Sequence, residues 1–428
     1  MFFKLFQTLN YKKNFPYFIC TPLVYGIGAA SEHIAMASAY AKRSKKKLLI
    51  IKLNIFKKLL KYQVCNNALF DSLIINGYLN DKKSYVYKLI NFLIQAEFLF
   101  RRIFALACKF FKIDIRETFR FALIGVIDLY SENKNKVYED IHPLKIEDSI
   151  IDLTSSDIEE CKSLFKKYNL ENKKIVCLHV RDQNYYNDSN RRIYRNSNIN
   201  NYKEAIKYLI DKNYLVVRIG DKSAKKMDYQ NRYFIDYPFT KIKSEIMDLF
   251  LIKECNFYIG TPSGPMDTAY LFKKPLLLTN LYDIFPSYLR KKIDRGVFRK
   301  IIRKSDGKSL SLNEFVKLGI KYHQTEVYID DIDFIENTSS ELLDATKEFC
   351  NNIEKKKDKT INFEFDKKQI AFNSFISNRL EEIYNEDFLK NNVFGNNFWK
   401  KSHFLKITKR FKSCEGTYTL STLKDFYC

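Results

Sequence analysis

The chain has 428 residues, of which 46% are hydrophobic and 15% are aromatic. One hydrophobic core stops growing at about 250–300 residues, so this length predicts two domains and an extension. The apolar content excludes an intrinsically disordered protein. The formal net charge of +23 predicts attraction to nucleotides, nucleic acids or acidic lipids, although a general enrichment in Lys along the chain explains the charge equally well.

Nine cysteines lie at irregular spacing, with no C-x-x-C pair and no histidines at zinc-binding distances. Reduced thiols in a cytoplasmic protein are therefore expected. Lys4, Lys12 and Lys13 interrupt the apolar residues at the N-terminus, so the sequence predicts no signal peptide.

The first supersecondary unit is predicted close to the N-terminus. An apolar run at 18–23 precedes Gly26-Ile-Gly28, an Ala-rich helix at 29–42 and a second apolar run at 47–52. This order is typical of a βαβ unit, whose second strand should run parallel to the first. We expect an N-terminal α/β domain over residues 1–150, with a helical insertion at about 55–130.

Residues 88–113 form the most apolar long segment. Arg101, Arg102, Lys109 and Lys112 interrupt the run of about 20 apolar residues that a membrane-spanning helix needs. Two interpretations stay open: a buried helix hairpin, or a basic, aromatic-rich helix on the anionic inner face of the cytoplasmic membrane.

Short apolar strands alternate with helices in the second half of the chain. Strands are predicted at 174–180, 215–219, 257–259 and 275–279, with helices at 157–167, 202–212, 243–255, 265–272 and 341–355. This alternation indicates a buried parallel sheet. We place a C-terminal α/β domain at 151–345 and a helical extension at 346–428, with residues 131–145 as a polar linker.

Ligands of open parallel sheets bind beyond the carboxyl ends of the strands, so the residues there are the candidate site. The first group is His179-Val-Arg181-Asp182. Arg181 could donate two charge-assisted hydrogen bonds to a diphosphate, which Lys cannot reproduce. A structural histidine and a surface ion pair between Arg181 and Asp182 are the alternatives.

The second group is the turn Gly260-Thr-Pro-Ser-Gly-Pro-Met-Asp267 between a strand and a helix. Pro265 suits the first helical position, Gly264 permits close backbone approach, and Thr261 and Ser263 place hydroxyls beside free N–H groups. Such a turn binds phosphate, but it lacks the lysine of an ATP-hydrolysing P-loop. An ordinary capped turn is the alternative.

The third group is Arg218-Ile-Gly220-Asp221. Gly220 permits a tight turn, and Asp221 could accept a hydrogen bond from a ribose hydroxyl. Arg218 lies inside an apolar strand, where a charge needs a partner or a ligand. Structural pairing and donor binding both fit this group.

Gly26 and Gly28 would let a ligand approach the backbone of the N-terminal unit. Position 31 is Ser and the second strand ends without an acidic residue, so a dinucleotide-binding site is disfavoured. Glu32 or His33 could act as a general base on an acceptor hydroxyl. A capping glutamate and a packed histidine are the alternatives.

A metal site would need clustered carboxylates or histidines. The one D-x-D sequence, Asp331-Ile-Asp333, is interpreted as a solvated turn. We therefore predict no metal and no cofactor, with cationic side chains and a helix dipole holding the diphosphate.

Several of these stretches resemble a family of bacterial glycosyltransferases associated with surface-polysaccharide genes. They are CLHVRD, the stretch RNSNINNYKEAIKYLIDKNYLVVRIGD and FYIGTPSGPMDTAYLFKKPLLLTN, and the resemblance is specific over residues 175–280. More distantly, H-x-R at a strand end resembles the fucosyltransferases of GT-B architecture. That resemblance implies two Rossmann-like domains facing each other across a cleft, with Arg181 gripping the donor diphosphate beside Ser263 and Gly264. Asp182 stands where many fucosyltransferases carry a second arginine, which leaves the donor nucleotide open.

The predicted function is sugar transfer from a nucleotide-sugar donor to a glycan or lipid-linked acceptor in surface-polysaccharide synthesis. A nucleotide-sugar epimerase or a pyruvyl-type transferase with the same fold is an alternative enzyme. A basic nucleic-acid-binding protein is a third hypothesis. The two phosphate-type turns at strand ends argue against it.

Overall fold

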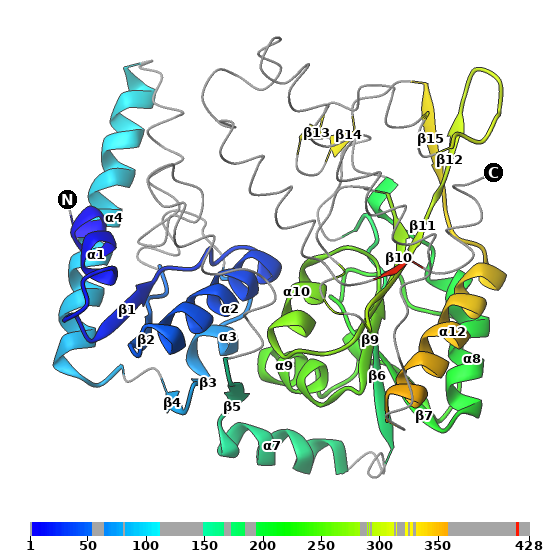
Figure 1. The fold of residues 1–428 in the computed structure, drawn as a ribbon, viewed down its shortest axis with the longest axis horizontal. Coiled ribbons are helices and arrows are strands. Elements are labelled where there is room, and N and C mark those ends of the chain that lie inside the picture. Colours follow the sequence, from blue (N-terminus) through cyan, green and yellow to red (C-terminus); the bar gives the residue numbers. More distant parts are fainter. Residues whose placement is uncertain are drawn as a thin grey trace. The chain divides into compact units, whose positions relative to one another are not determined.

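The computed structural model describes residues 2–53, 64–79, 82–111, 149–166, 173–184, 194–282, 289, 291, 293–311, 314, 322–323, 326–327, 331–357 and 417–418. The chain divides into two compact units (Figure 1). The first contains Met1–Ser163, Glu245–Phe250 and Leu271–Lys273, and the second contains Leu164–Ser244, Leu251–Tyr270 and Lys274–Cys428. The predicted linker at 131–145 lies outside the described residues, and the domain boundaries at 150 and 345 stay predictions.

The first unit opens with helix α1 (Phe2–Asn10) and then the predicted βαβ unit: β1 (Tyr17–Cys20), α2 (Ile27–Arg43) and β2 (Lys47–Ile50). The two strands pair in parallel with Tyr17 opposite Lys47, which confirms the prediction. Alanines make α2 narrow, and 11 of its 17 residues are buried, so the helix packs closely on both strands.

A small antiparallel sheet completes this unit. It contains β3 (Leu73–Ile75), β4 (Tyr78–Leu79) and β5 (Ile151–Leu153), in the order β4-β3-β5. The short helix α3 (Ala68–Asp71) precedes it and α7 (Ser155–Lys166) follows it. The sequence predicted no strand at 73–79, because two strands of three and two residues leave no readable alternation.

Residues Tyr85–Phe110 form one uninterrupted helix, α4. The hairpin interpretation of this segment is therefore wrong, and no turn residue within it would permit one. Its buried face packs against α1 and the βαβ unit, through Tyr87, Ile90, Ile94 and Phe98.

The second unit is built on a seven-stranded sheet in the order β16-β11-β10-β9-β6-β7-β8. All adjacent strands run parallel, as the alternation of strands and helices predicted. The strands are β6 (Lys174–His179), β7 (Tyr214–Arg218), β8 (Phe234–Asp236), β9 (Phe257–Gly260), β10 (Leu276–Leu281), β11 (Arg295–Phe298) and β16 (Thr417–Tyr418).

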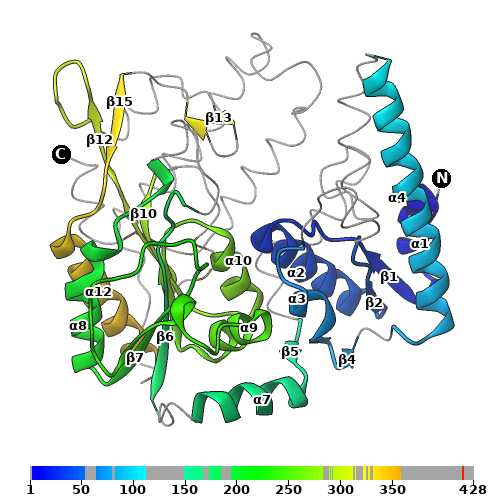
Figure 2. The same ribbon diagram turned by 180° about the vertical axis from the view of Figure 1, so that it is seen from behind.

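Helices cover both faces of this sheet (Figure 2). α8 (Lys203–Asp211) and α12 (Ser339–Lys357) pack together on one face, with Leu342 and Phe349 of α12 in the core. The opposite face carries α10 (Gly264–Leu271) and the end of α9 (Glu245–Glu254). α12 begins with a capping box, in which Thr338 and Glu341 each accept a hydrogen bond from the other's backbone N–H.

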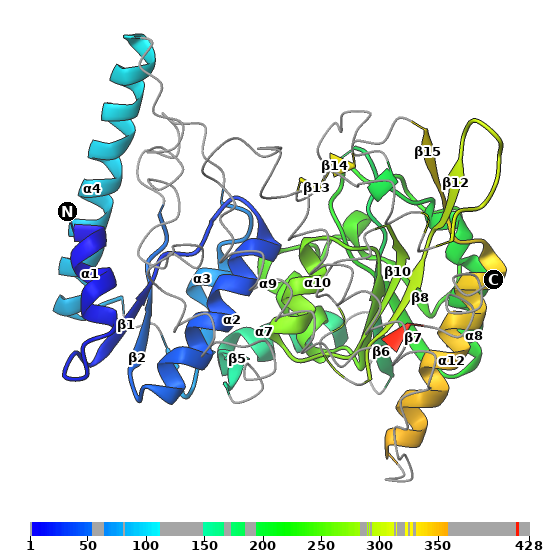
Figure 3. The same cartoon turned by 45° about the horizontal axis from the view of Figure 1, so that its top comes forward.

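Two antiparallel ribbons follow the sheet. β12 (Lys300–Arg303) pairs with β15 (Ile332–Ile335), and β13 (Tyr322–His323) pairs with β14 (Glu326–Val327) (Figure 3). A short 3₁₀ turn at Ile199–Tyr202 precedes α8, and another at Tyr237–Phe239 follows β8. Beyond residue 357 the structure describes only β16, so the predicted C-terminal extension is otherwise outside the described residues.

Candidate functional site

The carboxyl ends of β6 and β9 meet at the centre of the second unit's sheet. The two strands are neighbours, with His179 opposite Gly260. The Thr261 N–H donates to the His179 carbonyl oxygen over 3.1 Å, and the Arg181 N–H donates to the Thr261 hydroxyl over 3.0 Å. The structure therefore brings together the first two groups that the sequence singled out.

Gly260 makes this close approach possible. A Cβ atom at position 260 would lie 2.4 Å from the His179 carbonyl oxygen and 2.9 Å from the Tyr258 hydroxyl. Both atoms are fixed, one by the backbone of β6 and the other in the core, where Tyr258 is fully buried. Glycine is required here because of space and not because of an unusual backbone angle.

His179 and Ser263 join the two loops through their side chains. The His179 Nδ1 and the Ser263 Oγ lie 2.9 Å apart, and the Ser263 hydroxyl also donates to the Thr261 carbonyl oxygen over 3.1 Å. One hydroxyl has one proton, so this pair of bonds favours a histidine that carries its proton on Nδ1. Burial and then the nearby Arg218, Arg181 and Lys243 lower the pKa of His179 to about 3. The ring is therefore neutral at physiological pH.

Arg181 supplies a buried positive charge beside this turn. It is 6% exposed, and its guanidinium donates to the side-chain oxygen of Asn196. Its carbonyl oxygen accepts a hydrogen bond from the Ser197 N–H over 2.9 Å. The segment around 196 thus fixes Arg181 from both its backbone and its side chain.

Arg299, which the sequence did not single out, binds the same segment. It follows β11 directly, is 3% exposed, and donates to the Asn196 carbonyl oxygen and to the Ser197 Oγ over 2.8 Å. Two guanidiniums, those of Arg181 and Arg299, therefore donate to Asn196. The partners lie about a hundred residues apart in the chain, so no local pattern could have signalled this contact.

The Gly264 and Asp267 positions lie in the first turn of α10. The Met266 N–H donates to the Ser263 carbonyl oxygen over 3.0 Å, which starts the helix at the turn. α10 begins at Gly264, so Pro265 is its second residue, one position later than predicted. The positive end of the α10 dipole thus adjoins Thr261 and Ser263.

The third group has structural partners. Arg218 is 2% exposed and donates to both carboxylate oxygens of Asp236 over 3.1 and 3.2 Å, and to the Lys225 carbonyl oxygen over 2.7 Å. The carboxylates of Asp182 and Asp221 accept from the backbone N–H groups of Lys225 and Ser223, respectively.

Gly220 adopts φ of +152°, a backbone angle that favours glycine. Together with the bonds of Asp182 and Asp221, this conformation shapes the loop after β7. These residues thus fold the loops beside the site, and their role in donor binding stays a prediction.

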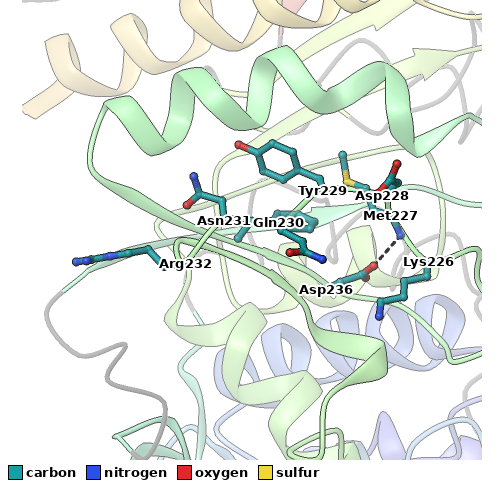
Figure 4. Close-up of a pocket in the computed structure, with 9 residues that line it drawn as sticks. Lys226, Met227, Asp228, Tyr229, Gln230, Asn231, Arg232 and Asp236 are labelled. Atoms are coloured by element: carbon teal, nitrogen blue, oxygen red, sulfur yellow. Dashed lines mark hydrogen bonds between the residues drawn. The ribbon is translucent and has the colours of Figure 1, made fainter.

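A shallow depression of about 800 Å³ lies along the same loop (Figure 4). It is lined by residues 226–232 together with Phe234 and Asp236. The Met227 N–H donates to the Asp236 carboxylate at its base. This depression lies at the β8 edge of the sheet, away from the turn after β9.

The predicted acceptor residues belong to the first unit. Gly26 caps α2 in an extended conformation and its carbonyl oxygen accepts from the Ala30 N–H, while Gly28 is buried in the helix. His33 is 2% exposed, and burial lowers its pKa. Glu32 is half-buried on the same helix.

The D-x-D sequence forms part of a turn and a strand. Asp331 accepts hydrogen bonds from the backbone N–H and the hydroxyl of Ser305, and Asp333 lies in β15. Within the described ranges, no three His, Cys, Asp or Glu side chains cluster closely enough to hold a metal ion.

Comparisons with known proteins give limited similarity. No family model matches the chain, and no curated protein matches it. Among solved structures it is similar to a family 9 glycosyltransferase from Veillonella parvula, with 11% identity, 63% of this chain and 82% of that chain covered, and a TM-score of 0.34.

A second similar structure is the dodecameric iron-containing heptosyltransferase TibC in complex with ADP-D-β-D-heptose. The identity is 14%, 43% of this chain and 45% of that chain are covered, and the TM-score is 0.24. Both TM-scores are below 0.5, so these similarities establish no function for this chain.

Proposed function

We propose that the chain is a glycosyltransferase whose nucleotide-sugar donor binds at the carboxyl ends of β6 and β9. The observation that carries the proposal is the pair of bonds linking these ends, Arg181 N–H to Thr261 and His179 to Ser263. They hold the backbone of Arg181, the Thr261 and Ser263 hydroxyls and the N-terminus of α10 at the same strand ends, and we interpret this group as a cationic cradle. A diphosphate has the charge and the acceptor oxygens that such a cradle fits.

Each part has a role in sugar transfer. The acceptor hydroxyl oxygen attacks the anomeric carbon, the bond from that carbon to the diphosphate oxygen breaks, and the electron pair leaves with the nucleoside diphosphate. Arg181 and the positive end of the α10 dipole stabilise the charge that develops on the leaving group. Neutral His179 holds Ser263 in place without adding charge. We assign leaving-group stabilisation to these groups, without a metal ion.

We assign the acceptor to the first unit, as the GT-B-like architecture implied by the sequence resemblance requires. Gly26, at the N-cap of α2, permits close approach of a ligand to the backbone, whereas Gly28 is buried in the helix, and Glu32 is the candidate that takes the proton from the acceptor hydroxyl. The burial of His33 argues against that residue as the base. The proposed acceptor is a glycan or a lipid-linked glycan at the cytoplasmic face, in surface-polysaccharide synthesis.

A thermal-shift screen with UDP, GDP, dTDP and CMP tests the donor site. A ligand that binds the folded state at 100 times its Kd adds about 2.7 kcal/mol of apparent stability. We expect one nucleotide to raise Tm by several degrees and its nucleoside, which lacks phosphate, to raise it little. Equal Tm shifts with the nucleotide and its nucleoside would show that the site does not recognise the diphosphate.

Incubation with the matching nucleotide sugar then identifies the reaction. A transferase releases nucleoside diphosphate faster when acceptor is added, whereas an epimerase converts the donor alone into a second nucleotide sugar. Conversion of the donor into a second nucleotide sugar without acceptor, and without release of nucleoside diphosphate, would contradict sugar transfer.

A further inference from the structure

Helix α4 is apolar on two opposite faces. Ile90, Ile94 and Phe98 point into the core of the first unit, where they pack with Phe3 and Phe6 of α1. A helix at the surface of a protein normally presents charged and polar residues on its outer face. The outer face of α4 departs from this rule.

The outer face carries a stripe of exposed apolar residues along the whole helix. We call it the α4 stripe. Its large members are Tyr85, Leu89, Phe92, Phe100, Ile103 and Phe110, with exposed fractions of 89%, 60%, 67%, 69%, 56% and 83%. The spacing follows the period of 3.6 residues, so these side chains lie on one line about 39 Å long.

This stripe is continuous because the positions between its large members are small. Ala96 and Ala107 occupy the same face, one turn from Phe92 and Ile103, respectively. No charged residue falls on the stripe. Isolated exposed apolar residues need no explanation, whereas a contiguous row of this length marks an interaction surface.

The charge around the stripe indicates what covers it. Residues 82–112 contain seven Lys or Arg residues and one acidic residue, Glu97. Glu97 faces inward, is 7% exposed, and accepts hydrogen bonds from Arg101 and from the Phe3 N–H. Lys88 is exposed at the edge of the stripe and lies over the Tyr85 ring. Lys82 and Arg101 pair with Asp71 and Glu97, and the other basic residues leave the segment with a net positive charge beside the stripe.

We infer that α4 lies in the interface of an anionic lipid bilayer, with the stripe buried at the boundary between headgroups and acyl chains. Aromatic and aliphatic side chains enter the boundary, and the neighbouring lysines and arginines contact the anionic headgroups. The inferred orientation is along the bilayer surface, because the opposite face of α4 packs in the core of the first unit. No helix in the described part of the chain is long and apolar enough to cross a membrane. A second copy of the chain fits less well, since two cationic segments would face each other.

Binding of the full chain to vesicles tests this inference without reference to enzyme activity. Co-sedimentation is measured with vesicles of phosphatidylcholine alone and with 30% phosphatidylglycerol added. We expect the partition coefficient to rise at least tenfold with the anionic lipid and to fall as salt is added. Equal binding to both vesicles, or none to either, overturns the inference.

A double substitution on the stripe locates the contact. Phe92→Ser with Phe100→Ser removes two exposed rings, and we expect the partition coefficient to fall at least tenfold with an unchanged circular dichroism spectrum. Tyr78→Ser is the matched control, because Tyr78 is 54% exposed in the same unit but lies on β4. An equal fall of the partition coefficient in both variants contradicts the bilayer as the partner. So does a dimer that forms without lipid and dissociates in the double variant.

Discussion

Substitution of Gly260 by Ala tests whether the junction between β6 and β9 depends on close backbone approach. The added Cβ would lie 2.4 Å from the His179 carbonyl oxygen, and real Cβ atoms essentially never approach closer than 3.0 Å. The strands must therefore separate by about 0.6 Å at this point, the difference between these two distances. The bond from the Thr261 N–H to the same oxygen lengthens with them.

The expected cost combines two effects. Overpacking of a tight core site costs about 1–3 kcal/mol, and a weakened backbone hydrogen bond adds about 1 kcal/mol. We expect Gly260→Ala to lower the free energy of unfolding by about 2–4 kcal/mol. Urea unfolding followed by circular dichroism measures the loss, and hydrogen exchange should be faster in peptides from residues 174–181.

Gly26→Ala is the matched control, because nothing lies within 4 Å of a Cβ atom there and the residue has φ of −132°. Its free energy of unfolding should fall by no more than about 1 kcal/mol, because alanine is a poorer N-cap than glycine. If Gly260→Ala costs no more than this control, the close approach that joins His179 to the turn is refuted.

Three further predictions concern the charged groups of the second unit. The pKa of His179 is about 3 in the folded state and about 6.5 in the unfolded state. The unfolded chain therefore takes up this proton first, so the free energy of unfolding is unaffected above pH 6.5 and decreases as the pH falls toward 3. At pH 5 the loss is at most about 2 kcal/mol, because His179 keeps some exposure, and His179→Gln should flatten the pH dependence in urea titrations. Arg218→Met leaves the Asp236 carboxylate without its buried cation, so it should cost about 3–5 kcal/mol in the same assay, and a cost below about 1 kcal/mol would contradict the pairing. Arg299→Met removes the hydrogen bond that holds Asn196, which in turn positions Arg181, so calorimetry should show nucleotide binding weakened about tenfold or more. Wild-type affinity in a folded variant would show that Arg299 has no role in positioning Arg181.

The central strands could be predicted because their apolar runs are bounded by turn residues. β6, β9 and β10 match the expected ranges within two residues at either end. β11 was missed, since it begins with Arg295 and follows a run of charged residues. Its arginine tolerates burial because Glu348 of α12 lies 3.8 Å away, a partner that no local pattern reveals.

The candidate site followed from the rule that strand ends in parallel sheets carry the ligand residues. That rule places His179 and Ser263 at one edge, because β6 and β9 are neighbours in the sheet. It does not show that Asp182 and Asp221 fold the loop through the Lys225 and Ser223 N–H groups. Such assignments depend on contacts between loops, which spacing in the sequence leaves open.

Isothermal titration of the preferred nucleoside diphosphate into the wild type and into Arg181→Ala tests the central claim most directly. Hydrogen bonds to a charged group contribute about 1.5–3 kcal/mol, so the account predicts a loss of affinity of about 10- to 150-fold. Arg303→Ala, which removes an arginine from the β12 strand of the same unit, should leave affinity unchanged. Equal affinity of the wild type and Arg181→Ala would contradict the account, because the guanidinium at the end of β6 would then not contact the diphosphate.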